Sequence, residues 1–62
     1  MKVEMNANMR ELQEVVVGRL YCLWSLFLEN VEAEGWSAKD LANAANECHD
    51  RRSFVKLACQ FV

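Results

Sequence analysis

The residue pair best suited to chemistry in this sequence is Cys48-His49. A thiolate beside an imidazole can act as a nucleophile with its general base. Adjacent residues on a helix point about 100° apart, because one turn takes about 3.6 residues. We therefore predict a buried thiol beside a surface imidazole rather than a catalytic pair. His49 could act as a pH switch only if a carboxylate, such as that of Glu47 or Asp50, lies close to it.

The Cys and His side chains that could bind a metal such as zinc are Cys22, Cys48, His49 and Cys59. A structural zinc site needs four ligands, usually with paired spacings such as C-x₂-C, and these residues show no paired spacing. The sequence also has no Gly-rich loop and no spaced acid/base pair. We therefore expect no catalytic, cofactor-binding or metal-binding residues, no cofactor and no enzymatic activity. Three cysteines form no disulfide framework, and free thiols in a reducing, cytoplasmic compartment are expected.

Two groups of charged residues could form an exposed recognition surface. The acidic group lies where a helix C-terminus is expected, and the helix dipole disfavours negative charge there. With Trp36 beside it, this acidic tip would suit a basic protein partner. The basic group could contact phosphate, or it could pair with the acidic group within the chain or across a dimer. The predicted recognition surface comprises Glu29, Glu32, Glu34, Trp36, Arg51 and Arg52, with Lys56 as a further basic residue.

Length and composition limit the possible architectures. The chain has 62 residues, 53% of them hydrophobic and 26% charged, with a net charge of −2. This length allows a single domain, 1–62, and the excess of apolar residues indicates a protein partner or a homodimer. Residues 1–35 carry a net charge of −3 and residues 36–62 one of +1, so nucleic-acid binding has weak support. The longest uncharged stretch, residues 20–28, is too short to span a membrane, and no signal peptide is seen.

Proline is absent and only two glycines occur, which favours an all-α fold with few, long helices. Residues 1–7 lack a helical pattern and are expected to fray. From Asn8, a possible N-cap, apolar residues recur every three or four positions, which predicts one long helix over about 9–34. The repeated positions are Met9, Leu12, Val16, Leu20, Leu23, Phe27 and Val31, with Val17, Tyr21, Trp24 and Leu28 beside them.

Gly35 is expected to end this helix in a left-handed conformation, and Ser37 to cap the next helix together with Asp40. That helix is predicted over about 38–49. The polar segment 49–53 leaves two interpretations open. Either Asp50 caps a separate helix over about 51–61, or one helix continues from 38 to about 60 and forms a helical hairpin with the first.

Two such hairpins would form a dimeric four-helix bundle. The layout is similar to that of Rop-type plasmid regulators in length and helix plan, without a shared residue motif. The predicted association seam comprises Leu20, Leu23, Trp24, Phe27 and Leu28. We expect a non-enzymatic protein–protein interaction module of the phage, plasmid or bacterial accessory type, which acts as a small regulator or inhibitor; an anti-defence role is one such function. The alternative is a dimeric nucleic-acid-associated regulator that uses the small basic patch.

Overall fold

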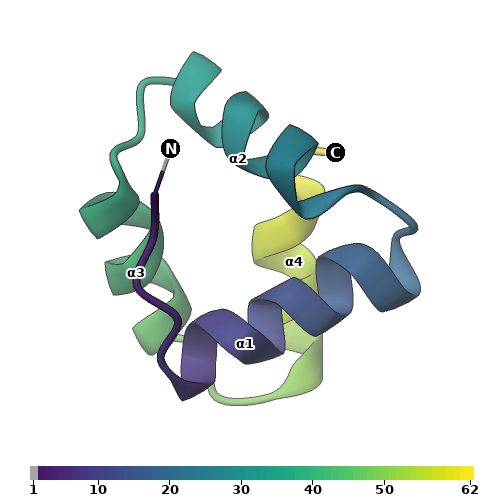
Figure 1. Cartoon of the computed structure of the whole chain (residues 1–62). Helices are drawn as coiled ribbons and strands as arrows, with labels where there is room; N and C mark the ends of the chain where they lie inside the picture. The colour runs from purple at the N-terminus through teal and green to yellow at the C-terminus, as the bar shows by residue number, and fades with distance from the viewer. Residues whose placement is uncertain (1) are drawn as a thin grey trace.

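Residues 2–62 are described by the computed structural model, and their regular structure is entirely helical, as predicted (Figure 1). The elements are α1 (Ala7–Glu14), the π-helical segment η1 (Val15–Arg19), α2 (Trp24–Ala33), α3 (Ala38–Asn46) and α4 (Arg51–Cys59). The chain measures about 25 × 22 × 17 Å along its principal axes. No helix within these residues is both long and apolar enough to cross a membrane.

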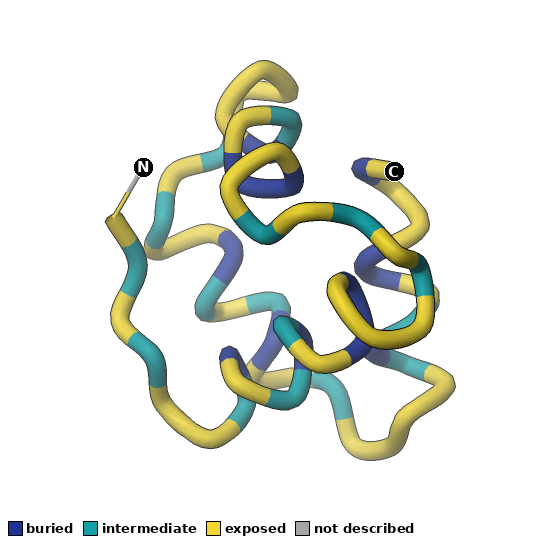
Figure 2. Tube along the Cα trace, turned by 45° about the vertical axis from the view of Figure 1, so that its right-hand side comes forward, coloured by how far each residue is buried: buried dark blue, intermediate teal, exposed yellow. Residues whose placement is uncertain are grey.

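One apolar core joins all five helical segments. α1 and η1 pack against α3 and α4, and the start of α2 lies near the chain end that follows α4 (Figure 1). In Figure 2, the buried positions of the helical segments lie mostly on the parts of the trace turned toward the middle of the molecule. The buried residues are Met9, Leu12, Val15, Val16, Phe27, Leu28, Val31, Leu41, Ala45, Phe54, Leu57, Ala58 and Phe61.

The prediction of a single helix over residues 9–34 is wrong, because the chain turns between η1 and α2. A straight helix from residue 7 to residue 33 would be about 40 Å long at about 1.5 Å per residue, which exceeds the longest dimension of the molecule, 25 Å. The turn instead brings the second half of the apolar pattern back onto the same core. The first helix also begins earlier than predicted: Asn6 caps α1 by accepting a 2.9 Å hydrogen bond from the backbone N–H of Met9.

The signals at the next two helix starts are confirmed. Gly35 has a φ of +86°, and Ser37 and Asp40 form a reciprocal capping box at the start of α3. Of the two interpretations of segment 49–53, the continuous helix from 38 to about 60 is not observed. The structure instead has the break near Asp50. Asp50 is extended, with a φ of −146°, and its carboxylate accepts from the backbone N–H of Ser53 at 2.8 Å. This cap starts α4 in a new direction, so that Phe54 is buried in the core.

Candidate functional site: an exposed apolar surface at a helix break

The turn between η1 and α2 is held in an unusual backbone conformation. Tyr21 has a φ of +53° and is the one non-glycine residue with positive φ within 2–62. The backbone N–H of Leu20 donates to Val15 O, and that of Cys22 donates to Val16 O, each at 3.0 Å. Helices often end in a left-handed residue, but that residue is usually glycine. A side chain in this conformation costs about 1–2 kcal/mol.

Burial of the residues that follow outweighs this cost. Phe27 and Val31 lie beyond the turn and are both completely buried. Each such side chain contributes about 1.5–3 kcal/mol when it leaves water. The ring of Phe27 also stacks on Trp24 at 5.3 Å and meets Phe61 edge-on at 5.7 Å. The core therefore stabilises the strained turn.

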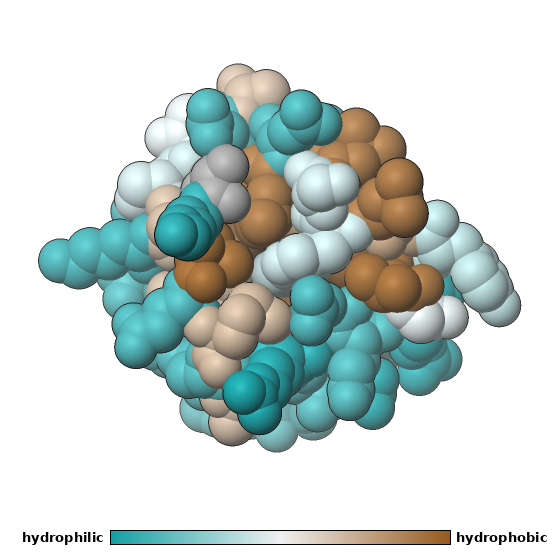
Figure 3. Space-filling view, in the orientation of Figure 1, coloured by the Kyte–Doolittle hydropathy of each residue, from teal (hydrophilic) through white to brown (hydrophobic). Residues whose placement is uncertain are grey.

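The same turn leaves large apolar side chains outside the core. Tyr21 is 90% exposed and Leu23 is 71% exposed, while Val17 and Leu26 are each nearly half exposed. These four residues lie on η1, on the turn and on α2, and we refer to them as the linker surface. In Figure 3, hydrophobic surface gathers on the right-hand side of the molecule, over this part of the chain. Apolar residues exposed together in this way are typical of protein-binding surfaces.

A shallow hollow adjoins the linker surface along the outer side of α1 and η1. It has a volume of about 360 Å³ and is lined by Gln13, Glu14, Val17 and Gly18. A methyl group placed on Gly18 would meet no atom within 4 Å. The hollow therefore gives a second chain close access to this side of the helix, next to Val17.

The predicted association seam does not lie on one face. Phe27 and Leu28 are buried within the chain, and Leu20 and Trp24 are partly buried. Of the five residues, only Leu23 is largely exposed, and it belongs to the linker surface. Most of the apolar surface that the sequence pattern assigned to a partner is thus covered by the chain itself.

The predicted recognition residues are also divided between separate parts of the fold. Glu29, Glu32 and Glu34 are exposed on α2 and at its end. Arg51, at the start of α4, lies with its Nε 2.9 Å from Glu11 Oε2, and its Nη2 is 4.0 Å from Glu14 Oε2. These two ion pairs join Arg51 to α1, whereas the predicted pairing of the basic group was with the acidic group on α2. Arg52 is exposed beside it.

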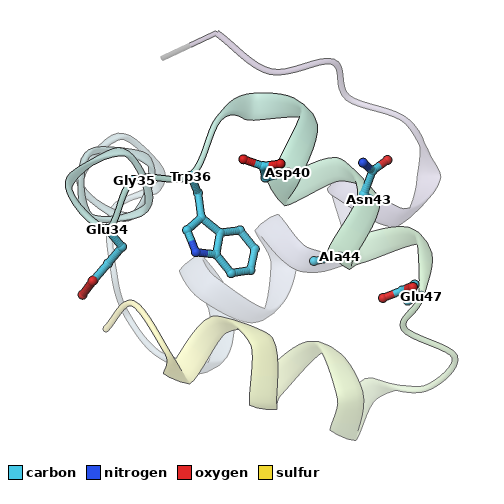
Figure 4. A pocket seen from close by; sticks show the side chains of 7 residues that line it. All are labelled: Glu34, Gly35, Trp36, Asp40, Asn43, Ala44 and Glu47. Atoms are coloured by element: carbon cyan, nitrogen blue, oxygen red, sulfur yellow. The ribbon is translucent and has the colours of Figure 1, made fainter.

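Trp36 borders a shallow groove of about 530 Å³ between the end of α2 and α3 (Figure 4). We call it the Trp36 groove; its lining residues are Glu34, Gly35, Trp36, Asp40, Asn43, Ala44 and Glu47. The indole ring meets Phe61 edge-on at 5.0 Å, so this side chain also supports the core. Hydrogen bonds from Ser37 lower the pKa of Asp40 and keep its carboxylate ionised. The groove therefore has an acidic rim and an aromatic wall.

Cys48 and His49, the candidate nucleophile and base, lie in different surroundings. Cys48 Sγ donates to the backbone carbonyl of Ala44 at 3.4 Å. Burial, followed by the charges of Asp50 and Glu47, raises the pKa of the Cys48 thiol, so the thiol stays protonated near neutral pH. His49 is exposed. Within residues 2–62, no three Cys, His, Asp or Glu side chains are grouped as metal ligands would be.

Sequence reasoning missed most of the linker surface. Val17 and Tyr21 were assigned to the apolar side of a continuous helix, and Leu26 was not singled out. No local signal marks the turn, because the segment 19–24 contains neither proline nor glycine. The groove residues Asn43 and Glu47 were likewise missed, since they line the same groove as Trp36 only in the folded chain.

Comparisons of the chain with models of known protein families, with curated proteins and with solved structures found no match.

Proposed function

We propose that this chain is a non-enzymatic protein–protein interaction module that acts as a small regulator or inhibitor by binding another protein. The linker surface is the proposed docking surface. We also propose a cytoplasmic location, because free cysteine thiols are expected in a reducing compartment.

The exposure of Tyr21 is the observation that carries this proposal. Its side chain is 90% exposed, on a backbone conformation that glycine would adopt at lower cost. Folding alone gives no reason for an aromatic residue at this position. Tyrosine is, however, among the residues that contribute most to binding energy at protein interfaces. Leu23 and Leu26 provide apolar area on the α2 side of it, and Val17 provides it on the η1 side.

Charge around the linker surface favours a mainly apolar contact. Arg19 is exposed two residues after Val17, and the carboxylate of Glu14 is partly screened by Arg51. Opposite charges at the edge of an apolar patch orient a partner more than they strengthen its binding. We therefore propose a partner with an exposed apolar helix or groove and few charges at its centre.

The test compares partner binding by surface variants that leave the core intact. The double variant Leu23→Ser/Leu26→Ser removes apolar area from the linker surface. Ala33→Ser is the matched control, because Ala33 is also an exposed apolar residue of α2 but lies at the opposite end of that helix from Leu23. We expect proteins cross-linked to the wild type in the host to be lost with the double variant and retained with the control. Purified partner should then show an altered activity when it is saturated with the chain.

Equal capture by the wild type and the double variant would contradict the proposal. So would binding only to DNA or RNA with an affinity that falls steeply as salt increases, since such binding depends on phosphate contacts. The second result would favour the alternative function, nucleic-acid binding through Arg51, Arg52 and Lys56. Circular dichroism of each variant shows whether its fold is retained.

A further inference from the structure

We propose that the turn at residues 20–23 is a hinge through which two copies of this chain exchange α1 and η1. In the dimer the linker surface is covered by a second copy, and the partner protein binds the monomer; this inference therefore rests on the proposed role of that surface in protein binding. In the exchanged dimer, α1 and η1 of each copy pack against α3 and α4 of the other.

The contacts between the two parts of the chain are suited to exchange. α1 and η1 contribute Met9, Leu12, Val15 and Val16 to the core, and all four are completely buried. They pack against α3 and α4, which lie on the other side of the hinge. An exchanged dimer rebuilds the same packing between copies, so the core itself does not favour either form.

The polar contacts between the two parts of the chain can also form either within one copy or between two copies. Asn8 Nδ2 donates to Asn46 Oδ1 at 2.9 Å, which joins α1 to the end of α3. Arg51 Nε lies 2.9 Å from Glu11 Oε2, which joins α4 to α1. Both interactions connect a residue before the hinge to a residue after it. They therefore form equally well within one chain or between two.

The hinge itself differs between the two forms. In the monomer, Tyr21 is strained at a φ of +53° and η1 is wound as a π-helix. The apolar period runs through the turn without interruption, from Val16 to Phe27, and the segment 19–24 has no proline or glycine. Opening the hinge allows one continuous helix from α1 through α2, which relieves the strain and pairs the backbone groups of the turn. Short strained hinges of this kind favour domain exchange.

Exchange also accounts for the exposed apolar side chains. When two chains exchange an element through a short hinge, the hinges of both copies lie next to each other about the two-fold axis. Tyr21 and Leu23 of one copy would then lie beside the same residues of the second copy. The most exposed apolar residues of the monomer, at 90% and 71%, would thus be covered in the dimer.

The first test uses a matched pair of hinge variants. Tyr21→Gly and Tyr21→Ala both remove the side chain, but only glycine relieves the strain of the closed turn and weakens a continuous helix. We measure mass by light scattering from micromolar to millimolar concentration, after refolding at each concentration. We expect a concentration-dependent dimer for the wild type, with dimer dissociation at least tenfold easier in Tyr21→Gly than in Tyr21→Ala. Equal weakening by both variants would overturn the exchange, because it would show that the dimer depends on the tyrosine ring alone.

The second test locates the contact between α1 and α3. Asn8→Cys and Asn46→Cys are introduced together into a chain carrying Cys22→Ser, Cys48→Ala and Cys59→Ser. A short bis-maleimide reagent then links the two new thiols in separated monomer and dimer fractions. We expect links within one chain in the monomer and covalently joined chains in the dimer.

Links confined to single chains in the dimer fraction would overturn the exchange. A wild type that stays monomeric at every concentration, including after refolding, would also overturn it. Neither result contradicts the proposed function, which the capture of other proteins by the linker surface tests independently.

Discussion

The side-chain amide of Asn30 donates a 2.7 Å hydrogen bond to the backbone carbonyl of Phe61. This bond joins α2 to the segment after α4, across 31 residues of sequence. It holds the Phe61 ring in edge-on contact with Phe27, at 5.7 Å, and with Trp36, at 5.0 Å. One amide thus positions the aromatic group that fixes α2 after the strained turn.

We expect Asn30→Ala to lower the free energy of unfolding by about 1–2 kcal/mol, because it leaves the Phe61 carbonyl without this donor. Asn43→Ala is the matched control, since Asn43 is exposed on α3. Urea unfolding followed by circular dichroism measures both changes. Alanine has the higher helix propensity, so Asn43→Ala should be neutral or slightly stabilising. Equal destabilisation of both variants would show that loss of the Phe61 hydrogen bond is not the cause.

The same substitution at the two glycines is expected to have opposite effects. Gly35→Ala places a side chain at a φ of +86° and should destabilise the chain by about 1 kcal/mol, although space is available there. Gly18 lies in η1 without positive φ, and a methyl group there meets nothing within 4 Å. Gly18→Ala should therefore stabilise the chain by about 0.5–1 kcal/mol. Thermal unfolding of both variants measures the difference, and shifts of the same sign would contradict this account.

Phe27 and Leu23 lie in the same predicted seam, but their substitutions should differ sharply. Phe27 is completely buried, and Phe27→Ala should cost about 3–5 kcal/mol. That loss equals the whole stability of about 3–5 kcal/mol expected for a core of this size, so the variant should be largely unfolded. Leu23 is 71% exposed, and Leu23→Ala should change stability by less than about 0.5 kcal/mol in dilute solution. Near-ultraviolet circular dichroism distinguishes the two, and a folded Phe27→Ala would mean that the core is assigned incorrectly.

The helix caps predict a loss of stability in acid. Hydrogen bonds from the backbone and side chain of Ser53 lower the pKa of Asp50 below its ordinary value of 3.8. A carboxyl group with a lower pKa in the folded state stabilises the fold above pH 3.8, and this contribution disappears as the pH falls through the lowered value. Asp50→Asn keeps a capping oxygen but does not titrate, so its stability should fall less steeply from pH 5 to pH 2. Unfolding curves at several pH values test this, and parallel pH profiles for wild type and variant would contradict it.

The sequence determined the class of the fold and marked the sites where α3 and α4 begin. The Ser37–Asp40 cap and the left-handed Gly35 were predicted from residue type and spacing, and the Asp50 cap was one of the two interpretations that residue type left open. Each depends on groups within about three residues of one another, so no distant contact is needed to specify it. The apolar pattern also identified most of the core residues of α1, η1 and α2.

Tertiary structure decided where the long apolar pattern breaks and which of its residues remain outside the core. A helical period specifies a face, but it does not specify what covers that face. The helical segment ends at Arg19 and the chain turns at Tyr21. Phe27 and Val31 can then be buried in the core, and this burial outweighs the strain of the turn. The exposure of Tyr21 and Leu23, and with it the candidate binding surface, is a consequence of that packing. No residue in the turn marks the helix break locally. For this reason the sequence pattern predicts one helix where the folded chain has two.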